Sequence, residues 1–451
     1  MSDTVESVTA KLEDLVTEPP VVADVSPAKD ADAEDNLIQS THAVQIKLAD
    51  QQADPNSTLY SVKSFEELGL SPELLDGLYD MKFSKPSKIQ ERALPLLLQD
   101  PPRNMIGQSQ SGTGKTAAFV LTMLTRINTG IGAPQAICLA PSRELARQIM
   151  DVVDGMSKFT KITKQLVIKD SLKRNEVVCS QVVVGTPGTV LGAIKRKHLP
   201  AKAVKIFVLD EADNMLDQDG LGDDSIRIKN LLGEKTQVVL FSATFPDHVR
   251  KFATKFAPEA NEITLKREEL SVDAIKQFYV DCDNDEHKYE TLCNIYDILT
   301  VSQSIIFCKT RNSAEKIAER MKKQGHSVNV LHGKMEAVDR DKAIDDFRRG
   351  EFKVLISTNV ISRGIDISQV SLVINYDIPT DSRGQVDFEA YLHRIGRTGR
   401  FGRTGVSIIF VDSKKTWEQM REIEVHFQRN IILLSSDWEE NEKILKGHIS
   451  T

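Results

Sequence analysis

Short apolar runs of strand length recur along the chain between longer stretches with helical spacing. They fall into two sets, which are residues 136–139, 182–184, 206–209 and 238–241, and then 304–307, 354–356, 372–374 and 406–410. Nearly continuous apolar strands that alternate with helices are typical of parallel sheets built from strand–helix–strand units. The sequence therefore predicts an α/β protein with two parallel-sheet lobes.

The segment between the two sets is charged and has no clear helix or strand pattern. We place a short linker there, at residues 264–273, with one lobe at 61–263 and the other at 274–451. Residues 1–60 hold 12 acidic and 3 basic side chains and predict a mostly disordered N-terminal extension. Spaced apolar side chains within it predict a short helix, namely Leu37, Ile38, Val44, Ile46 and Leu48.

The net charge of −7 comes from this extension, because residues 61–451 carry 55 basic and 53 acidic side chains. A near-neutral body can still bind nucleic acid through local basic groups and backbone amides. No apolar run reaches the roughly 20 residues that span a bilayer, and the first residues do not resemble a secretory signal. The five cysteines form no C-x-x-C pair, so we expect neither a metal centre nor disulfides. The cytosol or nucleus is the expected location.

A glycine-rich stretch follows Met105-Ile106 and precedes a helix-like segment. Its glycines let backbone N–H groups converge on phosphate oxygens, and the helix start adds its positive end. Lys115 would neutralise the β and γ phosphates of a nucleotide, and Thr116 would hold magnesium. The expected nucleotide-binding residues are Ser109, Gln110, Ser111, Gly112, Thr113, Gly114, Lys115 and Thr116.

Three acids, Asp210, Glu211 and Asp213, follow the apolar run 206–209. Open α/β sheets hold ligands at the carboxyl ends of their strands. We therefore expect Asp210 to hold magnesium through its water shell and Glu211 to orient or deprotonate an attacking water. A cluster of helix-capping carboxylates is the structural alternative. Together with the phosphate loop, the acids favour nucleotide hydrolysis.

Several motifs, in one order, resemble those of the DEAD-box ATP-dependent RNA helicases. They are residues 109–116, Asp210-Glu211-Ala212-Asp213, Ser242-Ala243-Thr244 and the run from His393 to Arg400, and the match extends from about Phe65 to at least Gly405. The resemblance implies two RecA-like lobes, ATP and Mg²⁺ as cofactors, and single-stranded RNA as the partner. It also implies that Ser242 and Thr244 couple the ATP and RNA sites.

The resemblance assigns the adenine base to two residues of the first lobe. Phe83 would stack on the base and Gln90 would read its edge, which suits an aromatic face and an amide. Lys82 stands where glycine is usual before this aromatic residue.

In the second lobe the resemblance assigns the γ-phosphate to two arginine fingers, Arg397 and Arg400. His393 would order the attacking water or the acidic motif, and Asp366 would accept a hydrogen bond from the ribose. These groups complete a site that begins in the first lobe.

RNA would lie across both lobes and contact mainly hydroxyls, amides and arginines, which suit the sugar–phosphate backbone. By resemblance the contacts are Pro141, Ser142, Arg143, Thr186, Pro187, Gly188, Arg311, Gly333, Thr358 and Asn359. Ser142, Thr189 and Asn359 replace the usual threonine, arginine and aspartate, and residues 167–171 lack the usual glycine pair. Arg340 is expected to pair within the second lobe. Lobe closure would bend the RNA strand and so separate a duplex locally.

Further segments resemble the messenger-RNA-export subgroup of these helicases. They are residues 48–60, 109–111, 215–223, 358–360 and 400–403. The resemblance implies remodelling of messenger ribonucleoprotein in the cytoplasm and nucleus, chiefly at the cytoplasmic face of the nuclear pore. The implied partners are an export factor, acting with inositol hexakisphosphate, and a cytoplasmic-side nucleoporin. We expect a monomer without membrane contact.

Two other functions remain open on the sequence. One is a general RNA helicase of translation or ribosome assembly, and the other is a clamp that ATP locks on RNA with little turnover. Glu211, Arg397 and Arg400 favour turnover. The segment 37–48 would restrain lobe closure by inserting between the lobes when RNA is absent.

Overall fold

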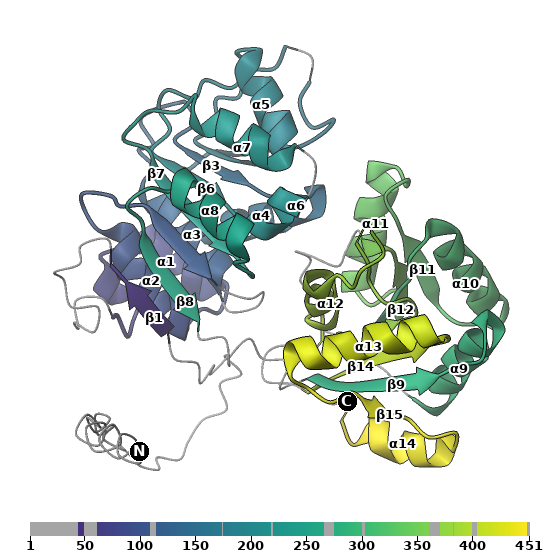
Figure 1. Ribbon diagram of the computed structural model, residues 1–451. Coiled ribbons are helices and arrows are strands. Elements are labelled where there is room, and N and C mark those ends of the chain that lie inside the picture. Colours follow the sequence, from purple (N-terminus) through teal and green to yellow (C-terminus); the bar gives the residue numbers. More distant parts are fainter. Residues whose placement is uncertain are drawn as a thin grey trace, which may run out of the picture. The chain divides into compact units, whose positions relative to one another are not determined.

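The computed structural model describes residues 44–48, 61–108, 114–173, 175–217, 220–265, 275–299, 303–359, 370–381, 383–398 and 404–448, all within one compact unit. They form two α/β lobes, each with one sheet and helices on both of its faces (Figure 1). Among these segments, no helix is long and apolar enough to cross a membrane. The predicted two-lobe α/β fold is confirmed.

The first lobe has an eight-stranded sheet in the order β1-β8-β2-β7-β6-β3-β5-β4, parallel except for β1. Its strands are β1 (Val44–Lys47), β2 (Met105–Gln108), β3 (Ala136–Leu139), β4 (Lys164–Val167), β5 (Val182–Gly185), β6 (Ile206–Leu209), β7 (Gln237–Ser242) and β8 (Asn261–Leu265). Its helices are the 3₁₀ turn η2 (Glu66–Leu68), α1 (Pro72–Asp80), α2 (Lys88–Leu98), α3 (Lys115–Thr125), α4 (Arg143–Met156), α5 (Pro187–Lys195), α6 (Ala212–Asp217), α7 (Leu221–Lys229) and α8 (Asp247–Phe256).

Strand β6 shows why the central strands are apolar throughout. Ile206 and Val208 pack with residues of helices α1 to α4, whereas Phe207 and Leu209 pack on the opposite face with residues of α5 to α8. All four side chains are fully buried. Because successive side chains of a strand point to opposite faces, a strand covered by helices on both sides needs an unbroken apolar run.

The second lobe has a seven-stranded parallel sheet in the order β11-β12-β10-β13-β14-β9-β15. Its strands are β9 (Ile275–Asp281), β10 (Gln303–Phe307), β11 (Val328–Leu331), β12 (Val354–Ser357), β13 (Val370–Asn375), β14 (Gly405–Val411) and β15 (Ile432–Leu433). Its helices are α9 (Asp285–Ile298), α10 (Arg311–Lys323), α11 (Ala337–Arg348), α12 (Phe388–Ile395), α13 (Lys414–Phe427) and α14 (Trp438–Lys446).

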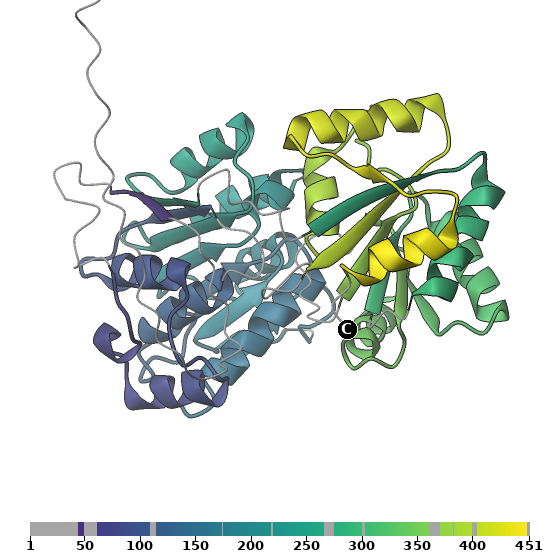
Figure 2. The same ribbon diagram turned by 90° about the horizontal axis from the view of Figure 1, so that it is seen from below.

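The last two helices cover opposite faces of this second sheet, as Figure 2 shows for the yellow end of the chain. Leu445 of α14 packs with residues of α9 and α10, whereas Met420 of α13 packs with Tyr391 of α12. Each face therefore has its own apolar core.

The prediction of a helix over residues 37–48 is wrong for residues 44–47, which form strand β1. Val44 pairs with Leu265 and Ile46 with Ile263 in an antiparallel ladder along β8. Ile46 and Leu48 pack on the first core, while Lys47 is exposed. Val44, Ile46 and Leu48 repeat every second residue, which is the period of a strand rather than a helix. Residues 37–43 lie outside the described segments.

The boundary of the first lobe lies slightly beyond the predicted one. Thr264 and Leu265, which we placed in the linker, belong to strand β8, and strand β9 begins at Ile275. The remainder of the predicted linker lies outside the described residues.

Candidate nucleotide site and RNA-facing segments

The candidate nucleotide-site residues of the first lobe lie at the carboxyl ends of three adjacent strands. Lys115 begins α3 shortly after β2, Asp210 follows β6, and Ser242 ends β7. These strands are neighbours in the order β2-β7-β6, so the sheet brings together groups that are far apart in sequence. This is the edge at which parallel sheets hold ligands.

Lys115 and Asp210 form a buried ion pair, with 3.6 Å between Nζ and Oδ1 and side chains 6% and 1% exposed. Burial by itself would lower the pKa of Lys115, but Asp210, Glu211 and Asp213 outweigh it and raise the pKa. Burial and the neighbouring Glu211 raise the pKa of Asp210, against the opposing effect of Lys115. Three buried carboxylates therefore share one lysine, and a second cation would relieve their repulsion.

A divalent cation fits this set of groups. Asp210 Oδ2 is buried and has no hydrogen-bond partner among the described residues, while Oδ1 accepts from Glu211 N at 3.0 Å. Mg²⁺ prefers carboxylate, hydroxyl and water oxygens, and Thr116 supplies a hydroxyl at the start of α3. Asp210 and Thr116 are therefore suitable magnesium ligands.

Glu211 is held in an uncommon backbone conformation. Its φ is 53°, in the left-handed region that non-glycine residues rarely adopt. Its carbonyl accepts from Met215 N at 3.1 Å, and Asn214 Nδ2 donates to its Oε2 at 3.4 Å. Strained backbone of this kind is concentrated at functional sites. The strain and the contacts fix the Glu211 carboxylate beside Asp210.

Asp213 connects the acidic motif to Ser242 and Thr244. Its Oδ2 accepts from Thr244 N and Oγ1 at 3.0 and 2.9 Å, and its backbone N–H donates to Ser242 Oγ at 3.1 Å. The structure thus brings the predicted coupling residues onto the acidic motif. The sequence assigns Asp213 no role of its own, and only its full burial and these three hydrogen bonds identify it as the link.

Of the two candidate adenine-reading residues, Gln90 contacts the start of α3 at Gly114. Gln90 Nε2 donates to the carbonyl of Gly114 at 2.9 Å, and its Oε1 accepts from Ser87 N at 2.9 Å. Gly114 has a φ of 93°, and a Cβ there would lie 2.6 Å from Gln90 Nε2, so this position requires glycine. Phe83 is partly buried against the core of the first lobe. Lys82, which precedes it, adopts a φ of 64°, a conformation that glycine would adopt without strain.

The RNA-facing candidates of the first lobe lie at the starts of α4 and α5. Ser142 Oγ caps α4 by accepting from Leu145 N at 3.2 Å, so this hydroxyl already has a structural role. Thr186 is the N-cap residue of α5, and Pro187 and Gly188 are its first residues. Helix starts present free N–H groups to anions, which suits phosphate binding.

Charged side chains of the two lobes form ion pairs between α4 and α11. Arg143 binds Asp341, with 2.9 Å between Nη2 and Oδ2, and Arg147 binds Asp341 and Asp345 at 3.0 and 2.9 Å. Arg340 Nη2 lies 2.6 Å from Oε1 of the buried Glu144. The prediction that Arg340 pairs within the second lobe is therefore wrong. Sequence spacing carried no signal for this contact, which joins residues almost 200 positions apart.

The RNA-facing candidates of the second lobe follow three adjacent strands, β10, β11 and β12, and Gly333 lies two residues after the end of β11. Arg311 begins α10, and Thr358 and Asn359 follow β12 directly. His393 Nε2 lies 3.8 Å from Asp213 Oδ2 of the first lobe. Arg397 is buried, and its Nε donates to the carbonyl of His393 at 2.9 Å. The predicted site residues outside the described segments are Ser109, Gln110, Ser111, Gly112, Thr113, Asp366 and Arg400.

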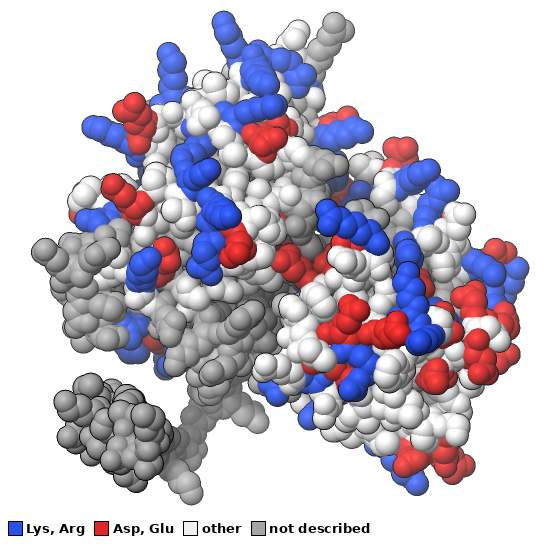
Figure 3. Space-filling view, in the orientation of Figure 1, with Lys and Arg blue, Asp and Glu red and all other residues white. Residues whose placement is uncertain are grey.

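Surface charge alone does not mark the RNA path. Figure 3 shows lysine and arginine side chains spread over the visible face of both lobes, with acidic side chains between them. The RNA-facing assignment therefore depends on particular loops rather than on a single basic patch.

Comparison with known proteins identifies the family. The family model for the DEAD/DEAH box helicase matches residues 87–252, and that for the helicase conserved C-terminal domain matches residues 287–402. The ATP-dependent RNA helicase dbp5 of Schizosaccharomyces pombe is 59% identical over 443 residues, which are 98% of this chain and 88% of the relative.

Solved structures give the same result. S. cerevisiae Dbp5 bound to RNA and ADP BeF3 is 57% identical, with a TM-score of 0.83 over 86% of this chain and 100% of that one. A point variant of S. cerevisiae Dbp5, bound to Nup159, a point variant of Gle1, IP6 and ADP, is 55% identical, with a TM-score of 0.63 over 84% of this chain and 99% of that one. The chain therefore belongs to the DEAD/DEAH box helicases, and within them to the family of the ATP-dependent RNA helicase Dbp5.

Proposed function

We propose that this chain is an RNA-dependent ATPase that couples lobe closure to bending of an RNA strand. We propose further that it remodels messenger ribonucleoprotein during export, at the cytoplasmic face of the nuclear pore. The carrying observation is the 3.8 Å separation of His393 Nε2 and Asp213 Oδ2, which places the acidic motif of one lobe beside the arginine-bearing segment of the other.

The first lobe supplies binding and water activation in this proposal. Lys115 is buried, cationic at neutral pH and close to Asp210, and it would neutralise phosphate oxygens. Glu211 is fixed by its backbone conformation and would orient the attacking water or accept its proton. Magnesium, held by Thr116 and Asp210, would supply further charge neutralisation.

The second lobe supplies charge where the phosphoryl group departs. Arg397 and Arg400 would act as arginine fingers, and His393 would keep this segment in register with Asp213. Neither lobe holds the complete set of groups. Turnover should therefore depend on closure.

RNA would promote closure by binding both lobes at once. Thr186, Pro187 and Gly188 would bind one part of the backbone, and Arg311, Gly333, Thr358 and Asn359 another, with Pro141, Ser142 and Arg143 between them. A strand that follows both surfaces cannot remain in a straight duplex. Local strand separation would follow, and hydrolysis would release the RNA.

The relatives support the assignment to messenger-RNA export. Their structures contain RNA, the export factor Gle1 with IP6, and the nucleoporin Nup159. We propose equivalent partners for this chain, with inositol hexakisphosphate bound through the export factor. The expected location is the cytoplasm and nucleus, enriched at the cytoplasmic face of the pore.

The test is steady-state ATP hydrolysis with and without single-stranded RNA, for the parent chain and for Glu211→Gln. The amide keeps the shape of the side chain but removes the base, so RNA and nucleotide binding should survive while turnover falls by at least about 100-fold. Addition of the export factor with inositol hexakisphosphate controls for a missing activator. ATP turnover that RNA does not change, with or without the activator, would contradict the proposal. ATP-dependent RNA binding by the parent chain without measurable turnover would favour a clamp.

A further inference from the structure

Arg394 is a buried arginine that the roles described above leave unused. It belongs to α12, three residues before Arg397, and its side chain is 1% exposed. Its guanidinium lies over the ring of Phe307, 4.9 Å from the centroid. Buried arginines are costly unless their donors are satisfied, so the identity of its acceptors is informative.

Arg394 donates to neutral oxygens of Asn375, the last residue of β13, and of the loops that follow β12 and β13. Nε donates to Asn359 Oδ1 at 3.0 Å, and Nη2 donates to the same oxygen. Nη1 donates to Asn375 Oδ1 at 3.0 Å and to the carbonyl of Asp377 at 2.7 Å. Burial lowers the pKa of Arg394 to about 10, with only partial compensation from Asp377. A buried guanidinium bonded mainly to neutral oxygens fixes the geometry of its neighbours, but its desolvation lowers the stability of the folded state.

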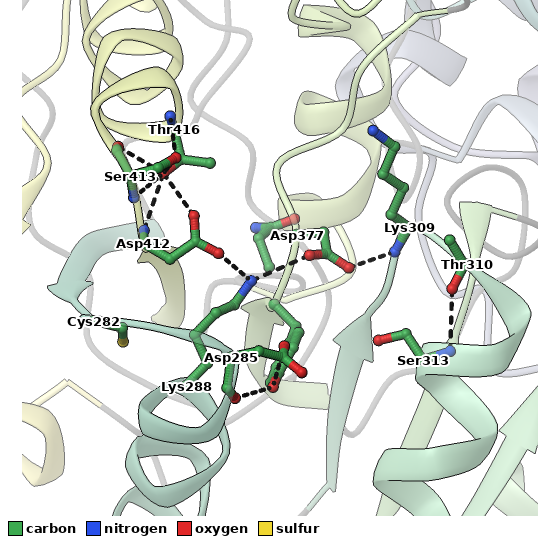
Figure 4. A network of polar contacts seen from close by, with 12 residues as sticks. Cys282, Asp285, Lys288, Lys309, Thr310, Ser313, Asp377, Asp412, Ser413 and Thr416 are labelled. Carbon is green, nitrogen blue, oxygen red and sulfur yellow. Dashed lines mark hydrogen bonds and ion pairs between the residues drawn. The ribbon is translucent and has the colours of Figure 1, made fainter.

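These acceptors connect Arg394 to two RNA-facing loops. Asn359 is exposed and directly follows Thr358. The carboxylate of Asp377 accepts from Lys309 N at 2.7 Å and from Lys288 Nζ at 3.2 Å, as Figure 4 shows. Lys309 lies two residues before Arg311, at the other RNA-facing turn. Both turns are therefore tied to the segment that carries Arg397.

Arg394 is in turn joined to Arg397 through the backbone. Arg397 N donates to the carbonyl of Arg394 at 3.1 Å, and Arg397 Nε donates to the carbonyl of His393 at 2.9 Å. A displacement of Arg394 would therefore displace the turn that holds the candidate arginine finger.

We propose that Arg394 is a positioning residue, which transmits RNA contact at Thr358 and Asn359 to Arg397. The inference rests on the proposed RNA-dependent hydrolysis and deepens it, because it names the path between the two ligands within the second lobe. Asn359 is the RNA-side contact and Arg394 the link. The link requires an acceptor oxygen at position 359 but no negative charge there.

The test varies Asn359, and the free energy of unfolding of each variant is measured beside its turnover, because loss of the acceptor leaves two donors of the buried Arg394 unsatisfied. Steady-state ATP hydrolysis is measured at saturating ATP over a range of single-stranded RNA concentrations. Asn359→Leu removes the acceptor of two charge-assisted hydrogen bonds from Arg394 and should lower kcat at saturating RNA at least about tenfold. Asn359→Asp keeps the acceptor and should hold kcat within about twofold, while its charge raises the RNA concentration for half-saturation.

Two arginine variants complete the design. Arg394→Lys keeps the positive charge, but a single ammonium group cannot make the several hydrogen bonds of the planar guanidinium. This variant should therefore lower kcat, as Asn359→Leu does. Arg349→Gln is the matched control, because this arginine is 59% exposed and pairs with Asp346 and Glu351 of its own surface. The control should behave as the parent.

The outcomes separate the inference from the proposed function. A parent whose turnover RNA does not stimulate would overturn both. A stimulated parent together with an Asn359→Leu variant of parental kcat would overturn the inference alone, since Asn359 would then only bind RNA. Equal losses of kcat in the Asp and Leu variants would also overturn it, because the acceptor would then not matter.

Discussion

Arg143, expected at the RNA backbone, forms an ion pair with Asp341 of the other lobe, with 2.9 Å between Nη2 and Oδ2. It also donates from Nη1 to the carbonyl of Lys169 at 2.9 Å. The Asp341 carboxylate also forms an ion pair with Arg147, with 3.0 Å between Oδ1 and Nη1. Asp341 therefore orients two basic side chains of α4 and joins the lobes beside the proposed RNA path.

Removal of this carboxylate should weaken closure. We expect Asp341→Ala to lower RNA-stimulated ATP turnover by several-fold to about 30-fold, since it removes two ion pairs that contribute up to about 1 kcal/mol each. The measurement is the ATPase rate at saturating ATP and RNA. Asp346→Asn, on the same helix but paired with Arg349 of its own lobe, is the control and should leave the rate unchanged. A parental rate in Asp341→Ala would show that the contact does not assist closure.

Lys82 offers a test of backbone strain beside the candidate adenine site. Lys82 N bonds the carbonyl of Tyr79 and Phe83 N that of Leu78, at 2.9 and 3.0 Å, and together they end α1 through a residue with φ 64°. Lys82→Gly should stabilise the first lobe by about 0.5–1 kcal/mol, because the relief of strain exceeds the added entropy of the unfolded chain. Urea unfolding measures the change. Lys82→Ala should give no such gain, and a less stable glycine variant would contradict the argument.

The sequence predicted much of this architecture because the central strands are apolar on both faces. The continuous apolar run 206–209 predicted a buried strand. The rule that parallel sheets hold ligands at the carboxyl ends of their strands then placed the following acids in the site. The sequence does not identify strand β1 readily, because Val44, Ile46 and Leu48 fit an interrupted helical face as well as the two-residue repeat of a strand. Contacts such as Arg340–Glu144 depend on how the lobes meet, which no local pattern specifies. Arg394 lies in a recognised motif, but only its burial and its acceptors indicate a role.

Lys288 stabilises the second lobe by lying between two carboxylates, Asp377 and Asp412, at 3.2 and 3.1 Å (Figure 4). Burial opposes its charge, but the two acids outweigh burial and raise the pKa of Lys288. Burial likewise opposes the charge of Asp412, but Lys288 and the hydroxyls of Thr416 and Ser413 lower its pKa below the ordinary 3.8.

Lys288→Met should therefore destabilise the second lobe by about 2 kcal/mol at pH 7, less than for a fully buried pair because both acids are partly exposed. A lowered carboxylate pKa gives stability that is present above the ordinary value and is lost as the pH falls through the folded-state value. The difference between parent and variant should therefore shrink below about pH 4. Urea unfolding at pH 7 and near pH 4 measures this difference, with Lys342→Met, at an exposed position of α11, as the control. A difference that grows on acidification would contradict this account.

The acidic extension should restrain turnover without RNA. Residues 1–43 hold 10 acidic and 2 basic side chains, which can compete with RNA for the same cations. Residues 44–48 cannot insert between the lobes as we expected, because β1 pairs with β8. A chain that begins at residue 44 keeps this strand and should show a several-fold higher ATPase rate without RNA. An unchanged rate at low and physiological salt would exclude this inhibition.

The central claim is that ATP turnover requires groups from both lobes. Its most direct test is the RNA-stimulated ATPase rate of Arg397→Gln relative to the parent, with ADP affinity measured in parallel because ADP lacks the γ-phosphate. Loss of an arginine finger should lower the rate by at least about 100-fold while ADP affinity stays within about twofold. A rate close to that of the parent would show that the first lobe hydrolyses ATP without the second, and would contradict the two-lobe site.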